Sequence, residues 1–167
     1  MFSWTVIATT GERFSDFAPY VASVNDAGTV AFQAALRGGG TGVFTGSGGA
    51  VAEAARPALL AGVTSHPDLN DAGALSFYGD LPGGGQGVFL LRDGRLHTIA
   101  DTRGSFASIG PLGPTMNEAG TVAFRAERTA GQDRTYTITV MTTDSSGNAS
   151  TATTTVTVSQ TSRRRST

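Results

Sequence analysis

Apolar and small or polar residues alternate along the stretch GTVAFQAAL, which follows a turn-like Asn-Asp-Ala near the N-terminus. A period of two over this length predicts a β-strand with one face buried. We expect one face to carry Val30, Phe32 and Ala34 and the other to carry Ala31, Gln33 and Ala35. A later stretch repeats the pattern, with Val122, Phe124 and Ala126 opposed to Ala123, Arg125 and Glu127.

The same eight-residue sequence occurs three times, as NDAGTVAF (25–32), NDAGALSF (70–77) and NEAGTVAF (117–124), at spacings of 45 and 47 residues. In the first two copies a glycine triplet and then GVF follow at the same offsets. The unit is therefore about 45 residues long, a period typical of solenoids, propellers and other arrays.

Each copy begins with asparagine, and glycine follows three residues later. These are residues that a type I turn favours at its first and fourth positions, because the asparagine side chain caps the turn and glycine relieves its exit. We therefore predict a structural turn at each of the pairs Asn25 and Gly28, Asn70 and Gly73, and Asn117 and Gly120. We expect these asparagines to be well buried compared with the acidic residues that follow them.

The remaining turn signals predict the fold class. The glycine triplets 38–40 and 83–85 and the Asp93-Gly94 pair favour chain reversals between short strands. Three or four antiparallel strands per unit are typical of a propeller blade. The helical alternative at 50–62 contains Pro57 and flanking glycines. We therefore predict an all-β fold of two to three propeller-blade-like tandem repeats, followed by a β-hairpin.

Composition excludes several classes of function. The 167 residues include no cysteine, so a disulfide framework, a thiolate nucleophile and a cysteine zinc site are excluded. The 12 basic residues include the run at 163–165 and face 13 acidic residues, which argues against nucleic acid as a partner. We see no apolar run long enough to insert into a membrane and no signal peptide in MFSWTVIATTGERF.

With their trailing GVF, the three copies resemble the tandem NxxGxxxF repeats of bacterial choice-of-anchor tandem repeat proteins over roughly residues 5–130. This resemblance implies a secreted or surface-anchored bacterial protein with a propeller-like β array. It implies an extracellular or cell-surface location, and it carries over no catalytic residue and no cofactor.

The C-terminal part resembles the last hairpin of a bacterial immunoglobulin-like extracellular module, because TYTITV and TVTV alternate around DSSGN. We expect a repeat region at 1–133, a hairpin at 134–159 packed on the third repeat, and a disordered tail at 160–167. Tyr136 lies 19 residues after Asn117, the offset of the GVF aromatic in the earlier copies. This register predicts that 134–142 pairs with 121–128, with Tyr136 on the face of Phe124, and that 151–158 is the next strand.

Candidate chemistry is sparse. Asp26, Asp71 and Glu118 occupy equivalent turn positions. They are either a ring of carboxylates for a cation or a sugar, or acids that an exposed turn tolerates. His66 lies in SHPD, where sequence neighbours do not make a catalytic triad, and His97 has no second histidine at metal-binding spacing. No metal or cofactor is expected.

These observations favour a non-enzymatic extracellular module with a structural role or with a protein or a glycan as its partner. One alternative is a carbohydrate-active propeller enzyme that uses the turn carboxylates, and another is a gene fragment without independent function. Fewer than three clear units leave sheet edges open, so self-association is expected.

Overall fold

The computed structural model describes residues 2–55, 60–129, 134–143 and 149–158, and this part of the chain contains β-strands and no helix. All its strand pairs are antiparallel. The predicted all-β class is confirmed. None of the described sheets closes on itself.

Two five-stranded sheets share one strand order. The first contains β1 (Phe14–Phe17), β2 (Ser23–Val24), β3 (Val30–Leu36), β4 (Thr41–Gly46) and β5 (Ala52–Ala55), in the order β1-β3-β4-β5 with β2 also paired to β3. The second contains β6 (Gly62–Val63), β7 (Asp68–Leu69), β8 (Leu75–Asp80), β9 (Gln86–Arg92) and β10 (Arg95–Asp101), in the order β6-β8-β9-β10 with β7 also paired to β8.

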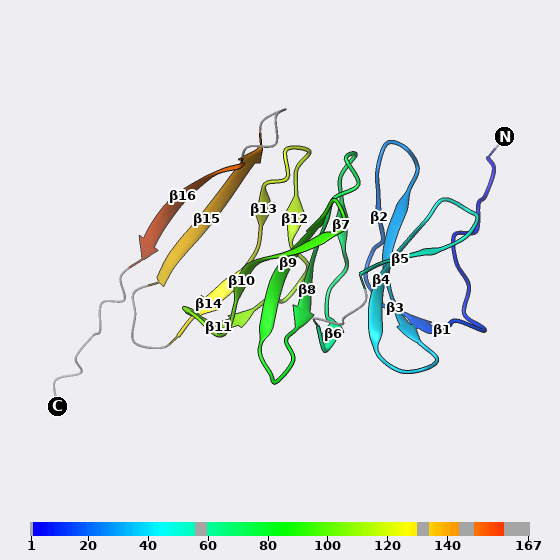
Figure 1. Cartoon of the computed structure of the whole chain (residues 1–167), viewed down its shortest axis with the longest axis horizontal. Helices are drawn as coiled ribbons and strands as arrows, with labels where there is room; N and C mark the ends of the chain where they lie inside the picture. Colours follow the sequence, from blue (N-terminus) through cyan, green and yellow to red (C-terminus); the bar gives the residue numbers. More distant parts are fainter. Residues whose placement is uncertain (1, 56–59, 130–133, 144–148, 159–167) are drawn as a thin grey trace.

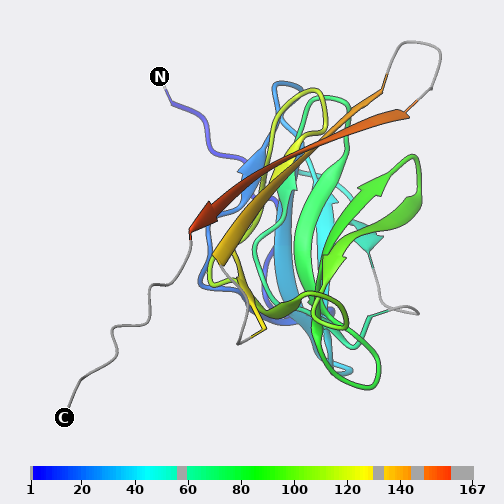
Figure 2. The same cartoon turned by 90° about the vertical axis from the view of Figure 1, so that its left-hand side faces the viewer.

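The rest of the described chain forms two-stranded sheets. The chain around the third copy of the repeated sequence contributes β11 (Phe106–Ile109) paired with β14 (Ala126–Arg128), and β12 (Thr115–Met116) paired with β13 (Val122–Ala123). A hairpin of β15 (Arg134–Thr143) and β16 (Ala149–Val158) follows. The sheets succeed one another from the N-terminus at one end to the hairpin at the other (Figure 1), and the hairpin crosses in front of the other sheets when seen from its own end (Figure 2).

The glycine-rich reversals form where they were predicted. In the triplet 83–85 all three glycines have positive φ, and the carbonyl of Gly85 accepts the N–H of Leu81 at 2.9 Å. Asp93 and Gly94, with φ of 51° and 69°, join β9 to β10 as a tight hairpin. Left-handed φ values at both central residues match the right-handed twist of the strands that they connect.

Both faces of the central strands are buried, whereas the alternation predicted one buried face. In β4, Val43 and Phe44 point to opposite faces and both are fully buried. In β3, Ala31 and Phe32 are likewise both buried. The reason is that the first sheet is covered on both sides. For the third copy the prediction holds, since Val122, Phe124 and Ala126 are at least partly buried while Ala123, Arg125 and Glu127 are exposed.

Apolar clusters join successive sheets. Ala31, Val43 and Ala55 of the first sheet share one cluster with Phe77 and Phe89 of the second. A second cluster contains Tyr78, Val88 and Leu90 of the second sheet together with Ile109 and Val122. A third lies on the other face of the first sheet, around Phe14, Phe32 and Phe44. Small residues on one sheet therefore face large ones on the next, which lets the sheets approach closely.

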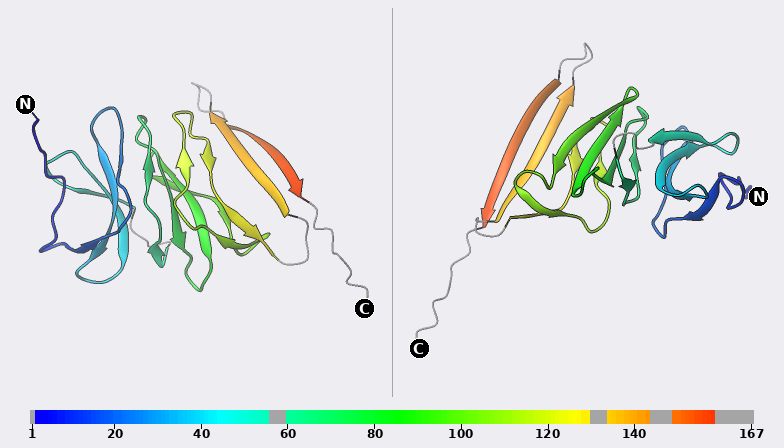
Figure 3. Two further views of the ribbon diagram at one scale, coloured as in Figure 1. Left: turned by 180° about the vertical axis from the view of Figure 1, so that it is seen from behind. Right: turned by 60° about the horizontal axis from the view of Figure 1, so that its bottom comes forward.

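The predicted pairing of 134–142 with 121–128 is wrong. In the described chain β15 hydrogen-bonds to β16, from Arg134↔Val158 to Thr143↔Ala149, and it lies beside β13 and β14 without joining their sheets (Figure 3). The expected strand at 151–158 is confirmed as part of β16. The side chain of Tyr136 and residues 144–148 and 160–167 lie outside what the structure describes, so the expected face of Tyr136 and the expected disordered tail stay predictions.

Tyr78 makes the stability of the packing between the second and third sheets dependent on pH. Its hydroxyl accepts the N–H of Arg125 at 3.4 Å, and its ring is buried in the second cluster. Burial raises the pKa of Tyr78 above its ordinary value of 10.0, and the hydrogen bond from Arg125 opposes that shift. The stability that follows from this raised pKa is fully present below pH 10.0 and is lost as the pH rises through the higher folded-state pKa.

We therefore expect the free energy of unfolding of the native protein to fall above pH 10.0 more steeply than that of Tyr78→Phe. Urea unfolding followed by circular dichroism on both sides of this pH measures the difference. Parallel pH profiles for the two proteins would contradict the assignment.

Candidate functional site

The three predicted turns form with the same internal hydrogen bonds. In each turn the asparagine carbonyl accepts the N–H of the glycine three residues on, at 2.9–3.0 Å, in the pairs Asn25 and Gly28, Asn70 and Gly73, and Asn117 and Gly120. The Oδ1 atom of each asparagine accepts the N–H of the residue four positions on, at 2.9 Å, from Thr29, Ala74 and Thr121. The glycines have φ of 75°, 78° and 82°, so each turn needs glycine at its exit. The predicted asparagine caps are confirmed.

The turns are also bonded to one another, and we call these contacts the turn ladder. Asn25 Nδ2 donates to the carbonyl of Asn70, and Asn70 Nδ2 donates to the carbonyl of Glu118, both at 3.4 Å. Asn25 and Asn70 therefore each reach toward the turn of the copy that follows. The loops after β2, β7 and β12 lie along one edge of the molecule in this order (Figures 1 and 3).

The acidic residues of the turns belong to the turn ladder. The N–H of Asp26 donates to Asp71 Oδ1 at 2.8 Å, and the N–H of Asp71 donates to Glu118 Oε2 at 2.8 Å. Each of these two carboxylates thus accepts a hydrogen bond from a backbone N–H of the preceding turn. The carboxylate of Asp26 accepts no hydrogen bond from the part of the chain that the structure describes.

Burial of the three asparagines differs along the turn ladder. Asn70, which lies between two turns, is only 2% exposed, and Asn25 is half-buried. Asn117 is exposed, as Glu118 is, so the expectation that all three asparagines are better buried than the neighbouring acids is wrong for this copy. The physical reason is that Asn25 and Asn70 each contact the turn that follows, whereas the described chain has no turn after Asn117 for its side chain to contact.

A parallel set of contacts lies two residues before the asparagines. Ser23 Oγ accepts the N–H of Leu69 at 3.0 Å, and Asp68 accepts the N–H of Met116 on one carboxylate oxygen and the hydroxyl of Ser23 on the other. These residues were not predicted from the sequence. Their signal is a polar residue at the same offset in each copy, Ser23, Asp68 and Thr115.

The remaining candidates are not brought together. Ser65 Oγ donates to the carbonyl of His66 and accepts the N–H of Tyr78, while Asp68 belongs to the contacts just described. His97 is exposed on β10. No group of three or more histidine, aspartate or glutamate side chains among the described residues is placed to hold a metal ion.

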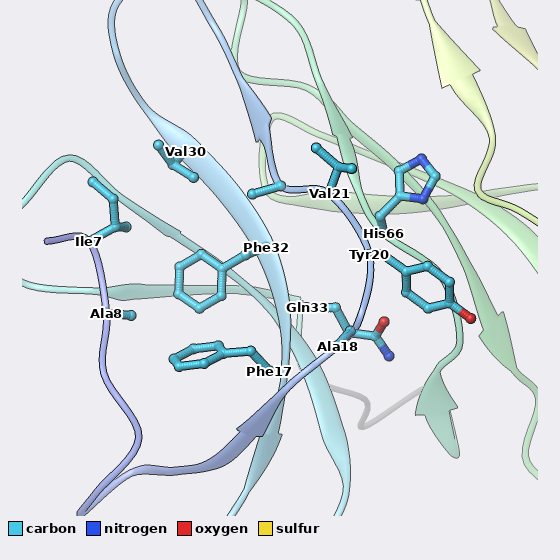
Figure 4. A pocket seen from close by; sticks show the side chains of 11 residues that line it. Ile7, Ala8, Phe17, Ala18, Tyr20, Val21, Val30, Phe32, Gln33 and His66 are labelled. Atoms are coloured by element: carbon cyan, nitrogen blue, oxygen red, sulfur yellow. The ribbon is translucent and has the colours of Figure 1, made fainter.

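An apolar pocket of about 270 Å³ lies between residues 7–8 and the segment that joins β1 to β2. Figure 4 shows Ile7 and Ala8 on one side, Phe17 and Phe32 at its centre, and Gln33 behind the connecting segment. Gln33 Nε2 donates to the carbonyl of Val63, whereas its Oε1 is buried without a hydrogen-bond partner in the described chain. This pocket could not be predicted from the sequence, because its lining residues share no motif.

Comparisons with known proteins assign the chain to a family, and they assign it no activity. A family model described as a family of unknown function (DUF7453) matches residues 5–155. No curated protein and no solved structure matches the chain significantly. The described residues contain no helix with the length and apolarity that crossing a membrane requires.

Proposed function

We propose that this chain, which belongs to DUF7453, a family of unknown function, acts as a non-enzymatic β-repeat module. The role of this module is either structural or the binding of a protein or a glycan. The observation that supports this proposal is the turn ladder, because it uses equivalent residues of three sequence copies to join them. The extracellular location belongs to the same proposal and rests on the resemblance to surface-anchored repeat proteins.

The common strand order supports a repeat architecture. The order β1-β3-β4-β5 in the first sheet is matched by β6-β8-β9-β10 in the second, and the turn ladder joins the copies at intervals of 45 and 47 residues. We interpret these sheets as successive blade-like units in a short open array. In such an array each unit contacts its neighbours, and stability comes from the units and from the interfaces between them.

The turn acids favour this module over a carbohydrate-active enzyme. Glycoside hydrolysis needs two carboxyl groups on either side of a bound sugar, one of which donates a proton while the other attacks or activates water. Asp71 and Glu118 instead accept backbone N–H groups at 2.8 Å on exposed turns. Their chemistry is that of charge-assisted hydrogen bonds that hold two segments in register.

The test compares alanine variants at the three equivalent acids. Asp71→Ala and Glu118→Ala each remove the acceptor of a backbone N–H and are expected to lower the free energy of unfolding by about 0.5–1 kcal/mol. Asp26→Ala is the matched control and is expected to change it by much less, because the Asp26 carboxylate accepts no hydrogen bond in the described chain. Urea unfolding measures all three variants.

If the three acids formed a shared binding or catalytic centre, all three variants would lose ligand binding or catalysis and would keep the native free energy of unfolding. A loss of stability confined to Asp71→Ala and Glu118→Ala supports a structural role for the turns. Equal stability of all three variants would contradict it.

A further inference from the structure

The large apolar side chains that remain exposed are concentrated at the start of the chain. Six of the seven on the described surface lie between residues 2 and 24, namely Phe2, Trp4, Val6, Tyr20, Val21 and Val24. They belong to the two segments that border the apolar pocket, and we call them with the pocket the N-terminal patch. Trp4 and Phe2 are each 94% exposed, and a large apolar patch on a protein surface is typical of an interaction site.

The two chain segments of the N-terminal patch contain no charged residue, and His66 contributes to the lining of the pocket. Residues 2–9 (FSWTVIAT) and 17–24 (FAPYVASV) contain no aspartate, glutamate, lysine, arginine or histidine. A contact between two identical surfaces brings like charges close to one another, so a charged patch would repel its own copy. The absence of charge from these segments removes that repulsion. The net charge of −1 for the whole chain adds little repulsion between copies.

The patch contains both a projecting side chain and a cavity that it fits. A cavity of roughly 150 Å³ is enough to bind benzene, and the pocket here has about 270 Å³ lined by Ile7, Phe17 and Phe32. It therefore has room for one aromatic side chain. The indole N–H is a hydrogen-bond donor, and Gln33 Oε1 at the pocket is a buried acceptor without a partner in the described chain.

The opposite end of the molecule is covered. The hairpin of β15 and β16 lies beside β13 and β14 of the third copy (Figure 2). A head-to-tail contact would bring the N-terminal patch against this hairpin, whereas a two-fold contact brings the N-terminal patches of two chains together. In a two-fold dimer the same surface is buried on each copy.

We propose that a second copy of this chain docks on the N-terminal patch by two-fold symmetry, with Trp4 of each copy in the apolar pocket of the other. The dimer buries the exposed aromatic side chains between residues 2 and 24, and Trp4 fills the pocket of the partner chain. Trp4 is the anchor of the contact, since a buried tryptophan in a pocket is typical of the few residues that dominate an interface.

The first experiment measures mass by size-exclusion chromatography with light scattering over a dilution series. We expect the native chain to approach twice its 17.0 kDa at high concentration and to dissociate on dilution. Val21→Asp, at a side chain that is 84% exposed, places two like charges in the contact, and we expect it to raise the dissociation constant at least about tenfold. Leu112→Asp is the matched control, since Leu112 is 74% exposed, lies outside the patch, and has a φ of 71° that aspartate tolerates.

The second experiment uses the fluorescence of Trp4, which is the single tryptophan of the chain. Its emission is expected to shift to shorter wavelength and to become less accessible to acrylamide as the dimer forms. Trp4→Ala is expected to remain folded by circular dichroism and to stay monomeric where the native chain is a dimer. A native chain that is monomeric at every concentration, larger assemblies without a dimer, or a Val21→Asp variant that dimerises like the native chain would each overturn the proposal.

Discussion

Replacing Phe77 by alanine is expected to lower the free energy of unfolding by about 4 kcal/mol, the largest effect of any substitution considered for this protein. Phe77 is fully buried, and its ring lies 6.0 Å from that of Phe89. Both rings belong to the cluster that contains Ala31 and Val43 of the first sheet. The substitution therefore removes packing within the second sheet and between the two sheets, and it leaves a cavity. Urea unfolding followed by circular dichroism gives the difference.

The matched control is Phe124→Ala, at the equivalent position of the third copy. Phe124 is only partly buried against the second cluster, so its loss is expected to be less than half as large. Similar losses for the two variants would show that position 77 gains nothing from contact with the first sheet. Such a result would contradict the assignment of this cluster to the joint between the sheets.

The second large effect is expected for Asn70→Ala, at about 2 kcal/mol. The side chain of Asn70 accepts the N–H of Ala74 at 2.9 Å, donates to the carbonyl of Glu118, and is 2% exposed. Alanine leaves the N–H of Ala74 without its acceptor in a position from which water is excluded. A buried polar group that loses its partner carries the full cost of its desolvation.

The other two turns provide a graded comparison for the same substitution. Asn25 is half-buried and Asn117 is exposed, and both make the corresponding turn hydrogen bond at 2.9 Å. We expect Asn25→Ala to lose less stability than Asn70→Ala and Asn117→Ala to lose the least, because water can replace the lost acceptor at an exposed turn. An equal loss at all three positions would indicate that burial between turns contributes nothing.

Local features of the fold could be predicted from the sequence. The turns at Asn25, Asn70 and Asn117 depend on residues three and four positions away, and the glycine that each requires is visible in the sequence. The reversal at Asp93 and Gly94 is local in the same sense. The alternation in the third copy was also sufficient to assign the exposed and buried faces of 122–127, because in this part of the chain one side is open to solvent.

Contacts between distant segments could not be predicted. Ala31 and Gln33 were expected on the open side of a strand, yet Ala31 is fully buried against the second sheet. Small residues indicate equally a weakly apolar outer face or a closely packed inner one. For 134–142 the alternation identified a strand and could not identify its partner, which is β16. Asp71 and Glu118 were recognised as equivalent, but their use as acceptors for the preceding turn follows from stacking across 45 and 47 residues.

The turn ladder has a consequence for how such a chain can change over evolutionary time. Its contacts join equivalent positions even though the intervals between copies are 45 and 47 residues, so the length of the intervening chain does not set the contact. Insertions and deletions in the loops are therefore compatible with an unchanged contact between turns. A duplicated segment that keeps the Asn-acid-x-Gly turn brings its own donors and acceptors for the neighbouring copy. Genes that encode such chains can gain or lose whole copies by recombination, because the turns that become neighbours still carry matching donors and acceptors.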